Sequence, residues 1–207
     1  ARYNLAIALH KLGREKEAAQ ECRQTLVRFE HASGVAHSDT LRTRALLAEC
    51  LIAQGENAEA ETQLRALLPL AAKVWGAEHR TTLNCQSDLC QALSDQDKNA
   101  EAAKMLRRLI PLQTQVLGPE SRETLSTRGN YASVLYNLGK SAEAAQEYRQ
   151  LLPLVARVIG PEDKQVLALH ANYANALADL GKSAEAEEEY RQLLPLMARV
   201  FGPEDRQ

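Results

Sequence analysis

Apolar residues recur along the chain at the spacing of amphipathic helices. In the segment 125–159, Tyr131, Leu135 and Leu138 follow an i, i+4, i+7 pattern that places them on one helical face. A second stripe on one face consists of Ala144, Tyr148, Leu151, Leu152, Val155 and Ile159. Between them, Gly139 suits a left-handed helix end, and Ser141 can cap the following helix. The pattern predicts two antiparallel helices joined by a three-residue turn.

The hairpin pattern repeats with a period of 42 residues. Five glycines at this spacing end the predicted second helices: Gly34, Gly76, Gly118, Gly160 and Gly202. The turn inside each hairpin carries Gly13, Gly55, Gly139 or Gly181, with Asp97 at the equivalent position of the third repeat. Segments 139–163 and 181–205 are identical at 21 of 25 positions. The sequence predicts five repeats, at approximately 1–40, 41–82, 83–124, 125–166 and 167–207.

A single hairpin cannot bury its apolar face, so the predicted hairpins must stack. Small residues stand where helices would approach closely, in one column of Ala6, Ala48, Cys90, Ala132 and Ala174 and another of Ala18, Ala60, Ala102, Ala144 and Ala186. We therefore predict an all-α fold, in which residues 1–207 form a single α-solenoid of about five 42-residue repeats. Because the chain stops where another first helix would begin, we expect a fragment of a longer array.

Two features of the predicted second helices need a structural explanation. Asn57, Asn99 and Ser183 occupy the capping position equivalent to Ser141. Prolines recur inside four of the helices, at Pro69, Pro111, Pro153 and Pro195. A proline in a helix interior removes a backbone hydrogen bond, so we expect these helices to bend there.

The turn and the loop after the second helix carry a resemblance to a known family. Tyr131-Ala132, Leu135, Leu138-Gly139-Lys140 and Ala144 resemble the tetratricopeptide repeat (TPR). The longer 42-residue unit, with Val116-Leu117-Gly118-Pro119-Glu120 before Thr124-Leu125, is similar to the kinesin-light-chain class of these repeats. The resemblance covers nearly the whole chain. It implies a superhelix whose first helices line a concave side and a role in binding other proteins.

Composition narrows the class of protein. The chain has 207 residues, a formal net charge of −2, and 45% hydrophobic and 25% charged residues, which is ordinary for a soluble protein. It lacks the strongly basic character typical of nucleic-acid-binding domains, and no run of apolar residues is long enough to cross a membrane. Four irregularly spaced cysteines do not form a disulfide framework. We expect a cytoplasmic protein with no nucleic-acid or membrane partner.

No motif in the chain predicts catalysis or cofactor binding. Gly139-Lys140-Ser141 and Gly181-Lys182-Ser183 resemble the end of a phosphate-binding loop, but the required earlier glycine is replaced by Val134 or Ala176. His31 and His37 lie near each other in sequence without a completing carboxylate or cysteine cluster. We therefore predict that the protein is not an enzyme and has no cofactor or metal site.

A polar stripe on the first helices is the candidate binding surface. It runs at i, i+3, i+7 beside the apolar stripe, and the resemblance implies that it faces the groove. Asparagine side chains suit the backbone of an extended peptide, and arginines near the helix starts can pair with acidic side chains. The predicted peptide-binding residues are Asn4, Arg44, Glu49, Asp88, Gln91, Arg128, Asn130, Ser133, Asn137, Asn172 and Asn175.

Three functions are compatible with these observations. The first is a non-catalytic scaffold or adaptor that binds a peptide segment or a partner helix in the concave groove. The second is a structural array that associates with itself through exposed ends. The third is the regulatory sensor portion of a larger multidomain protein. The alternative to a binding groove is that the polar stripe consists of solvated residues on exposed helix faces.

Overall fold

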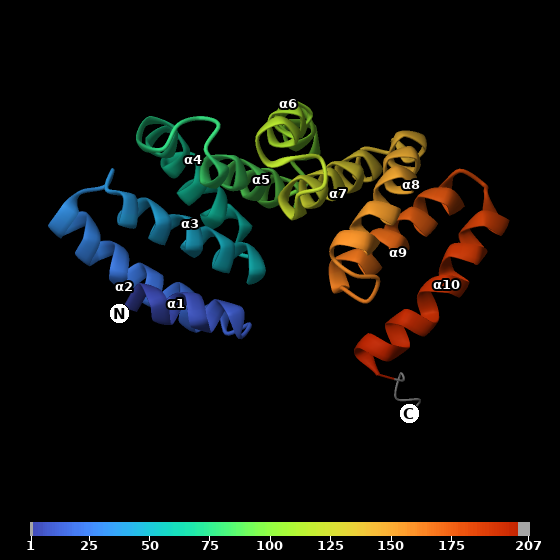
Figure 1. Cartoon of the computed structure of the whole chain (residues 1–207), viewed down its shortest axis with the longest axis horizontal. Helices are drawn as coiled ribbons and strands as arrows, with labels where there is room; N and C mark the ends of the chain where they lie inside the picture. Colours follow the sequence, from blue (N-terminus) through green and yellow to red (C-terminus); the bar gives the residue numbers. More distant parts are fainter. Residues whose placement is uncertain (1, 203–207) are drawn as a thin grey trace. The chain divides into compact units, whose positions relative to one another are not determined.

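The computed structural model describes residues 2–202, and within this range all regular secondary structure is helical (Figure 1). The helices are α1 (Arg2–Lys11), α2 (Glu15–Ser33), α3 (Ser38–Ala53), α4 (Asn57–Val74), α5 (Arg80–Ser94), α6 (Asn99–Leu117), α7 (Arg122–Asn137), α8 (Ser141–Val158), α9 (Lys164–Asp179) and α10 (Ser183–Phe201). Shorter first helices alternate with longer second helices. The all-α prediction and the hairpin pattern are confirmed.

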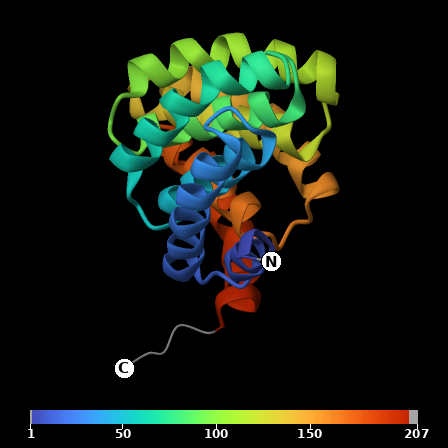
Figure 2. The ribbon, with the colours of Figure 1, turned by 90° about the vertical axis from the view of Figure 1, so that its left-hand side faces the viewer.

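The chain divides into two compact units, residues 1–112 and 113–207, and α6 spans their boundary. In the first unit each helix from α1 to α5 packs against the next, and in the second unit the same holds from α7 to α10. Figures 1 and 2 both show α1 and α2 side by side. Sequential antiparallel packing of this kind is the arrangement predicted for stacked hairpins.

Small residues lie in the core where the helices approach each other, as predicted. Every member of both small-residue columns is at most 4% exposed. Larger apolar residues fill the space around them, and Leu41, Leu83, Leu125 and Tyr148 are fully buried. Because a larger side chain at a column position would push two helices apart, the columns fix the spacing of the stack.

The turn inside each hairpin is a Schellman motif. In the fourth repeat Gly139 has φ +72°, its N–H donates to the Tyr136 carbonyl (2.9 Å), and the Lys140 N–H donates to the Leu135 carbonyl (3.0 Å). The third repeat keeps this geometry without glycine, because Asp97 adopts φ +60° and Lys98 N–H reaches the Leu93 carbonyl at 2.9 Å. Aspartate tolerates the left-handed region better than most residues, which explains the substitution.

The predicted caps of the second helices are wrong by one position. The N-cap residues are Glu56, Lys140 and Lys182, none of which makes a side-chain cap hydrogen bond. Asn57, Ser141 and Ser183 are instead the first helical residues, as is Asn99 in α6. The cause is the tight turn, since the residue that closes the Schellman motif also accepts the first bond of the next helix, as Lys140 does from Ala144 (3.0 Å).

Side-chain caps occur at the first helices, for which the sequence analysis named no capping residue. Ser121 Oγ accepts from Thr124 N–H (3.1 Å) and Asp163 Oδ1 accepts from Gln165 N–H (2.8 Å). At the same repeat position, His37 and His79 accept through Nδ1 at 3.3 and 3.2 Å. These two histidines therefore have a structural role in starting α3 and α5.

The four second helices that contain proline continue through it without interruption. Pro69, Pro111, Pro153 and Pro195 are all exposed, so their rings face solvent. The bend expected at these positions stays a prediction.

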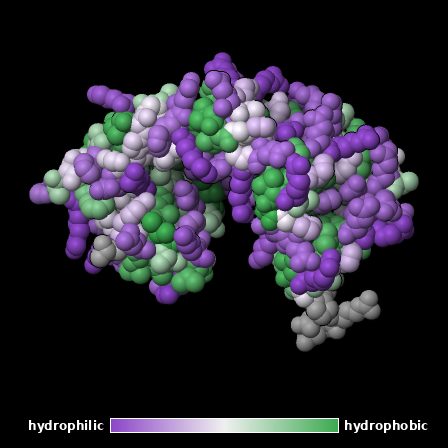
Figure 3. Space-filling view, viewed as in Figure 1, coloured by the Kyte–Doolittle hydropathy of each residue, from purple (hydrophilic) through white to green (hydrophobic). Residues whose placement is uncertain are grey.

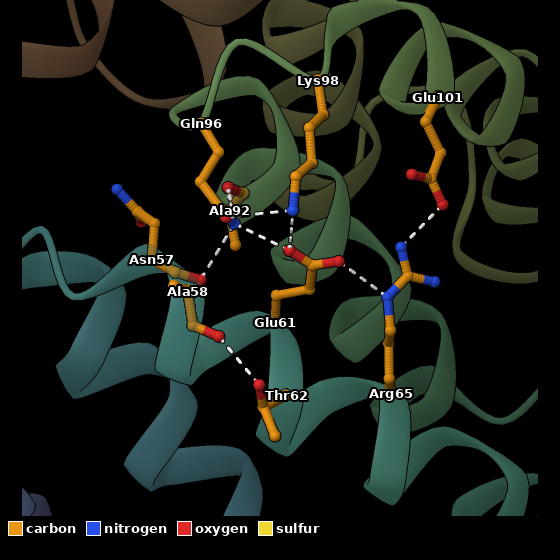
Figure 4. A network of polar contacts seen from close by, with 9 residues as sticks. All are labelled: Asn57, Ala58, Glu61, Thr62, Arg65, Ala92, Gln96, Lys98 and Glu101. Atoms are coloured by element: carbon orange, nitrogen blue, oxygen red, sulfur yellow. Dashed lines mark hydrogen bonds and ion pairs between the residues drawn. The ribbon is translucent and has the colours of Figure 1, made fainter.

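A polar network joins neighbouring hairpins in the first unit (Figure 4). The Glu61 carboxylate on α4 accepts from Lys98 Nζ (2.6 Å), Arg65 Nε (2.8 Å) and Gln96 Nε2 (2.9 Å). Arg65 also reaches Glu101 on α6 at 2.7 Å. The ammonium group of Lys98 is the main reason why the pKa of Glu61 is lowered to about 2. The ionised carboxylate thus joins α4 to the turn between α5 and α6.

Candidate functional site

The first helices form the inner side of the stacked hairpins in each unit. Besides their sequential neighbours, α1 contacts α3, α3 contacts α5, and α7 contacts α9. In a curved stack the closest elements lie on the inside of the curve, so these contacts are those expected if the first helices line the inner side of each unit. The face of the molecule drawn in Figure 3 is largely polar, with smaller apolar patches between the polar residues.

In the second unit the stripes of α7 and α9 touch each other. Asn172 Nδ2 lies 3.4 Å from Ser133 Oγ, which in turn lies 3.0 Å from the buried Tyr148 hydroxyl. Asn175 accepts a hydrogen bond from the Tyr190 hydroxyl. Asn137, at the end of α7, is exposed. Ser133, Asn172 and Asn175 are therefore held in place by internal contacts.

Asn130 differs from the other asparagines of this stripe. It is half-buried on α7, and its side chain makes no hydrogen bond within residues 2–202. A partly buried amide without a protein partner retains two donors and an acceptor for water or for a ligand.

The predicted arginines already have partners inside their own units. Arg44 pairs with Glu30, and Arg128 Nε lies 2.7 Å from Glu147 Oε1. Both guanidinium groups are mostly buried, with side-chain exposures of 16% and 18%. They brace α3 against α2 and α8 against α7, so a ligand carboxylate would have to displace an existing ion pair.

The stripe of the first unit is acidic. Asp88 on α5 is partly buried and makes no hydrogen bond or ion pair among the residues that the structure describes. Its burial, reinforced by the negative charge of Glu49 on α3, raises its pKa well above the usual value for aspartate. Gln91 and Asn4 are exposed. Two carboxyl groups, those of Asp88 and Glu49, thus lie near each other on this surface, and no cation among the described residues pairs with Asp88.

A cavity in the second unit was not predicted from the sequence. It has a volume of about 710 Å³ and lies among α8, α9 and α10. His170 and Glu189 face each other in its wall at 3.2 Å, near Arg149 and Tyr173. The exposed residues Glu185 and Glu188 also line it.

Sequence profiles and solved structures agree on the type of repeat. Three profiles described as tetratricopeptide repeat match residues 78–157, residues 1–39, and the pair of segments 41–66 and 167–192. The chain belongs to the tetratricopeptide repeat family. No curated protein is similar enough in sequence to match.

Several TPR structures share this fold. A kinesin-light-chain-type protein from Podosopora anserina with nearly identical TPR-like repeats has a TM-score of 0.75 and 23% identity, with 98% of this chain and 95% of that one covered. A Rap protein complexed with competence and sporulation factor has a TM-score of 0.79 and 14% identity, with coverages of 96% and 53%. PlcR from Bacillus thuringiensis, in complex with the peptide PapR7 and DNA, has a TM-score of 0.74 and 14% identity, with 97% of this chain and 70% of that one covered. At these identities the likeness concerns the fold.

TPR proteins of this kind are generally non-catalytic interaction scaffolds. Within residues 2–202, each helix is too short or too polar to cross a membrane.

Proposed function

We propose that this TPR array is a non-catalytic interaction module that binds an extended peptide segment or a partner helix along the polar stripe of its first helices. The observation that carries the proposal is Asn130, whose half-buried amide has no hydrogen-bond partner within the described residues. A bound peptide backbone would supply both a carbonyl and an N–H to such a side chain.

Two structural neighbours support the peptide as ligand class. The Rap structure contains competence and sporulation factor, and the PlcR structure contains the peptide PapR7. The formal net charge of −2 favours a protein or peptide partner over a nucleic acid.

The acidic stripe of the first unit suggests one property of the ligand. Asp88 and Glu49 are close enough for the charge of one to raise the pKa of the other. A lysine or arginine side chain placed between them would stabilise both carboxylates in their ionised form. We therefore expect peptides that carry a basic residue to bind this unit best.

The test is selection from a random peptide display library with the intact chain, followed by affinity measurement on the enriched peptide. Asn130→Ala should weaken binding about fivefold, because one hydrogen bond to a partly buried amide contributes about 1 kcal/mol. Asn130→Ala with Asn172→Ala should weaken it further, although Asn172 also contacts Ser133. Gln146→Ala, on an exposed face of the second helix α8, is the matched control and should leave affinity unchanged.

Two results would overturn the proposal. One is an enriched peptide whose affinity is the same for the wild-type chain and for Asn130→Ala. The other is the absence of any enriched sequence while circular dichroism shows a folded helical chain.

Self-association is the second candidate, and exposed apolar side chains on α10 favour it. Leu194 is 65% exposed and Phe201 57% exposed. Leu152, the residue of α8 that is equivalent to Leu194, is 6% exposed because α9 packs against α8. The occupant we propose for this face is a first helix of a second copy of the chain. Sedimentation velocity at increasing protein concentration separates this function from a monomeric adaptor.

A further inference from the structure

Three potential metal ligands converge at one end of the first hairpin. Among the described residues 2–202, the structure brings His10, Glu15 and Cys50 together, with one ligand atom from each within 4.8 Å of the others. His10 lies in the last turn of α1, Glu15 is the first residue of α2, and Cys50 belongs to α3. The group therefore combines three types of zinc ligand, an imidazole, a carboxylate and a thiol, from three helices.

The distances are close to those of a tetrahedral site. Cys50 Sγ lies 3.7 Å from His10 Nδ1. Two such ligands on one tetrahedral zinc ion would be about 3.6 Å apart, given Zn–N and Zn–S bonds of about 2.0–2.1 and 2.3 Å. Glu15 Oε2 lies 2.7 Å from the same nitrogen. This distance would have to open to about 3.4 Å, which a rotation of the glutamate side chain can supply.

The imidazole, carboxylate and thiol also hydrogen-bond one another. Glu15 Oε2 and Cys50 Sγ both lie within hydrogen-bond distance of His10 Nδ1. The Cys50 thiol has the side chains of Glu15 and Cys22 as further hydrogen-bond partners. A divalent cation would replace the shared hydrogens of this group, because it accepts a lone pair from all three ligand atoms at once.

A second carboxylate is positioned to orient the histidine. Glu49 Oε2 lies 3.7 Å from His10 Nε2, the nitrogen on the opposite side of the ring. Metal-binding histidines usually donate their other N–H to such a group, which fixes the tautomer and ring orientation. Cys50 is fully buried, whereas the His10 and Glu15 side chains are 30% and 18% exposed. A fourth ligand can thus come from water on the exposed side.

The equivalent positions of the next hairpin show that the fold does not require these residues. There the three positions hold Ile52, Asn57 and Ala92. The backbone is the same in both places, because Gln54 Nε2 donates to the Glu15 and Cys50 carbonyls and Gln96 Nε2 donates to those of Asn57 and Ala92. The three potential ligands are therefore particular to this place in the chain and are not a feature of the repeat.

We propose that His10, Glu15 and Cys50 bind a zinc ion, with Glu49 as a positioning residue. Coordination requires the thiolate, so the proton of Cys50 is released to solvent when the metal binds. The site shares one residue with the peptide stripe proposed above, because Glu49 belongs to the stripe and also lies beside His10.

Cobalt(II) titration of the full chain tests the proposal. We expect one equivalent to bind, with a near-ultraviolet thiolate-to-cobalt absorption band that zinc abolishes by displacement. Cys50→Ala should remove the band. Glu15→Asn and His10→Ile should weaken binding at least tenfold. Each of these changes introduces the residue of the next hairpin, so the helical content should persist. Glu49→Gln should lower affinity about 10- to 100-fold, as for other outer carboxylate partners of ligating histidines.

Cys90→Ala is the matched control. Cys90 is a buried cysteine of the same unit whose repeat equivalents are alanines, and its loss should leave the cobalt band intact. The proposal is overturned if the folded wild-type chain binds no cobalt or zinc in stoichiometric amount. It is equally overturned if the thiolate band survives in Cys50→Ala.

Discussion

Asp88, a residue of the proposed binding surface, opposes folding when it is ionised. Its pKa is raised by burial and by Glu49, so the folded state binds a proton more readily than the unfolded state does. Stability is therefore highest below the unfolded pKa of about 3.9 and decreases as the pH rises through the folded pKa. Other first helices carry asparagine at this position, at Asn4, Asn130 and Asn172. We expect Asp88→Asn to stabilise the chain at neutral pH.

The measurement is thermal unfolding of wild type and Asp88→Asn at pH 7 and near pH 4. An increase of about 1 kcal/mol in the free energy of unfolding would raise Tm by about 2–4 °C in a chain of this size. The difference should shrink at the lower pH, where the carboxyl group is neutral. Glu78→Gln removes an exposed carboxylate and should shift Tm little at either pH. A lower Tm for Asp88→Asn at pH 7 would contradict the account of Asp88 as a destabilising buried charge.

At the scale of the element, Glu61 behaves in the opposite way to Asp88, because folding lowers its pKa. Hydrogen bonds from Lys98, Arg65 and Gln96 hold its pKa at about 2, so it stabilises the folded state above the unfolded pKa of about 4.3. This stabilisation is lost as the pH falls from that value through about 2. Glu61→Gln should lower the free energy of unfolding by about 1–2 kcal/mol at pH 7, since its partners are partly exposed.

Urea unfolding at pH 7 and at pH 3 checks this prediction. The gap between wild type and Glu61→Gln should be narrower at pH 3 than at pH 7. The control is Glu59→Gln on the same helix, where Glu59 makes one exposed ion pair with Arg23 at 2.9 Å. That variant should change stability by less than about 0.5–1 kcal/mol. Equal losses in the two variants would show that the network adds nothing beyond a single surface ion pair.

The helices were predicted well from the sequence because the same local pattern occurs once in each of the five repeats. Glycine periodicity and small-residue columns were enough to place the hairpins and their core. The caps were missed because serine is a preferred N-cap residue and Ser141 follows the glycine turn. The backbone hydrogen bonds at Lys140 instead make Ser141 the first helical residue. His37 and His79 were not recognised as caps, since histidine is an unusual residue for that role.

The candidate sites were harder to predict because they depend on contacts between repeats. Spacing alone placed the polar stripe on the first helices. It gave no sign that Arg128 is held by Glu147, or that the Asn130 side chain makes no hydrogen bond within residues 2–202. The group of His10, Glu15 and Cys50 spans 40 residues of sequence, and no local motif links it. Ligands separated in this way converge only when α3 packs against the first hairpin.

At the scale of the whole molecule, the apolar face of α10 leads to a prediction about assembly. The face consists of Tyr190, Leu194, Met197 and Phe201, which are 37–65% exposed. Full burial of four such side chains would contribute no more than about 6–12 kcal/mol. Association of two proteins costs about 4–15 kcal/mol in lost motion and ordering. The two ranges overlap, so any self-association through this face should be weak and visible only at high protein concentration.

The contact expected is heterologous, because the face of α10 would receive a first helix of another copy and not a second α10. Such contacts do not close, so sedimentation velocity should show a weight-average size that grows with concentration instead of stopping at a dimer. Leu194→Glu should keep the chain monomeric at every concentration. Val158→Glu, an exposed apolar residue on α8 of the same unit, should leave association unchanged. A dimer of fixed size, or growth that persists in Leu194→Glu, would exclude head-to-tail stacking through α10 and leave peptide binding as the function of the inner helices.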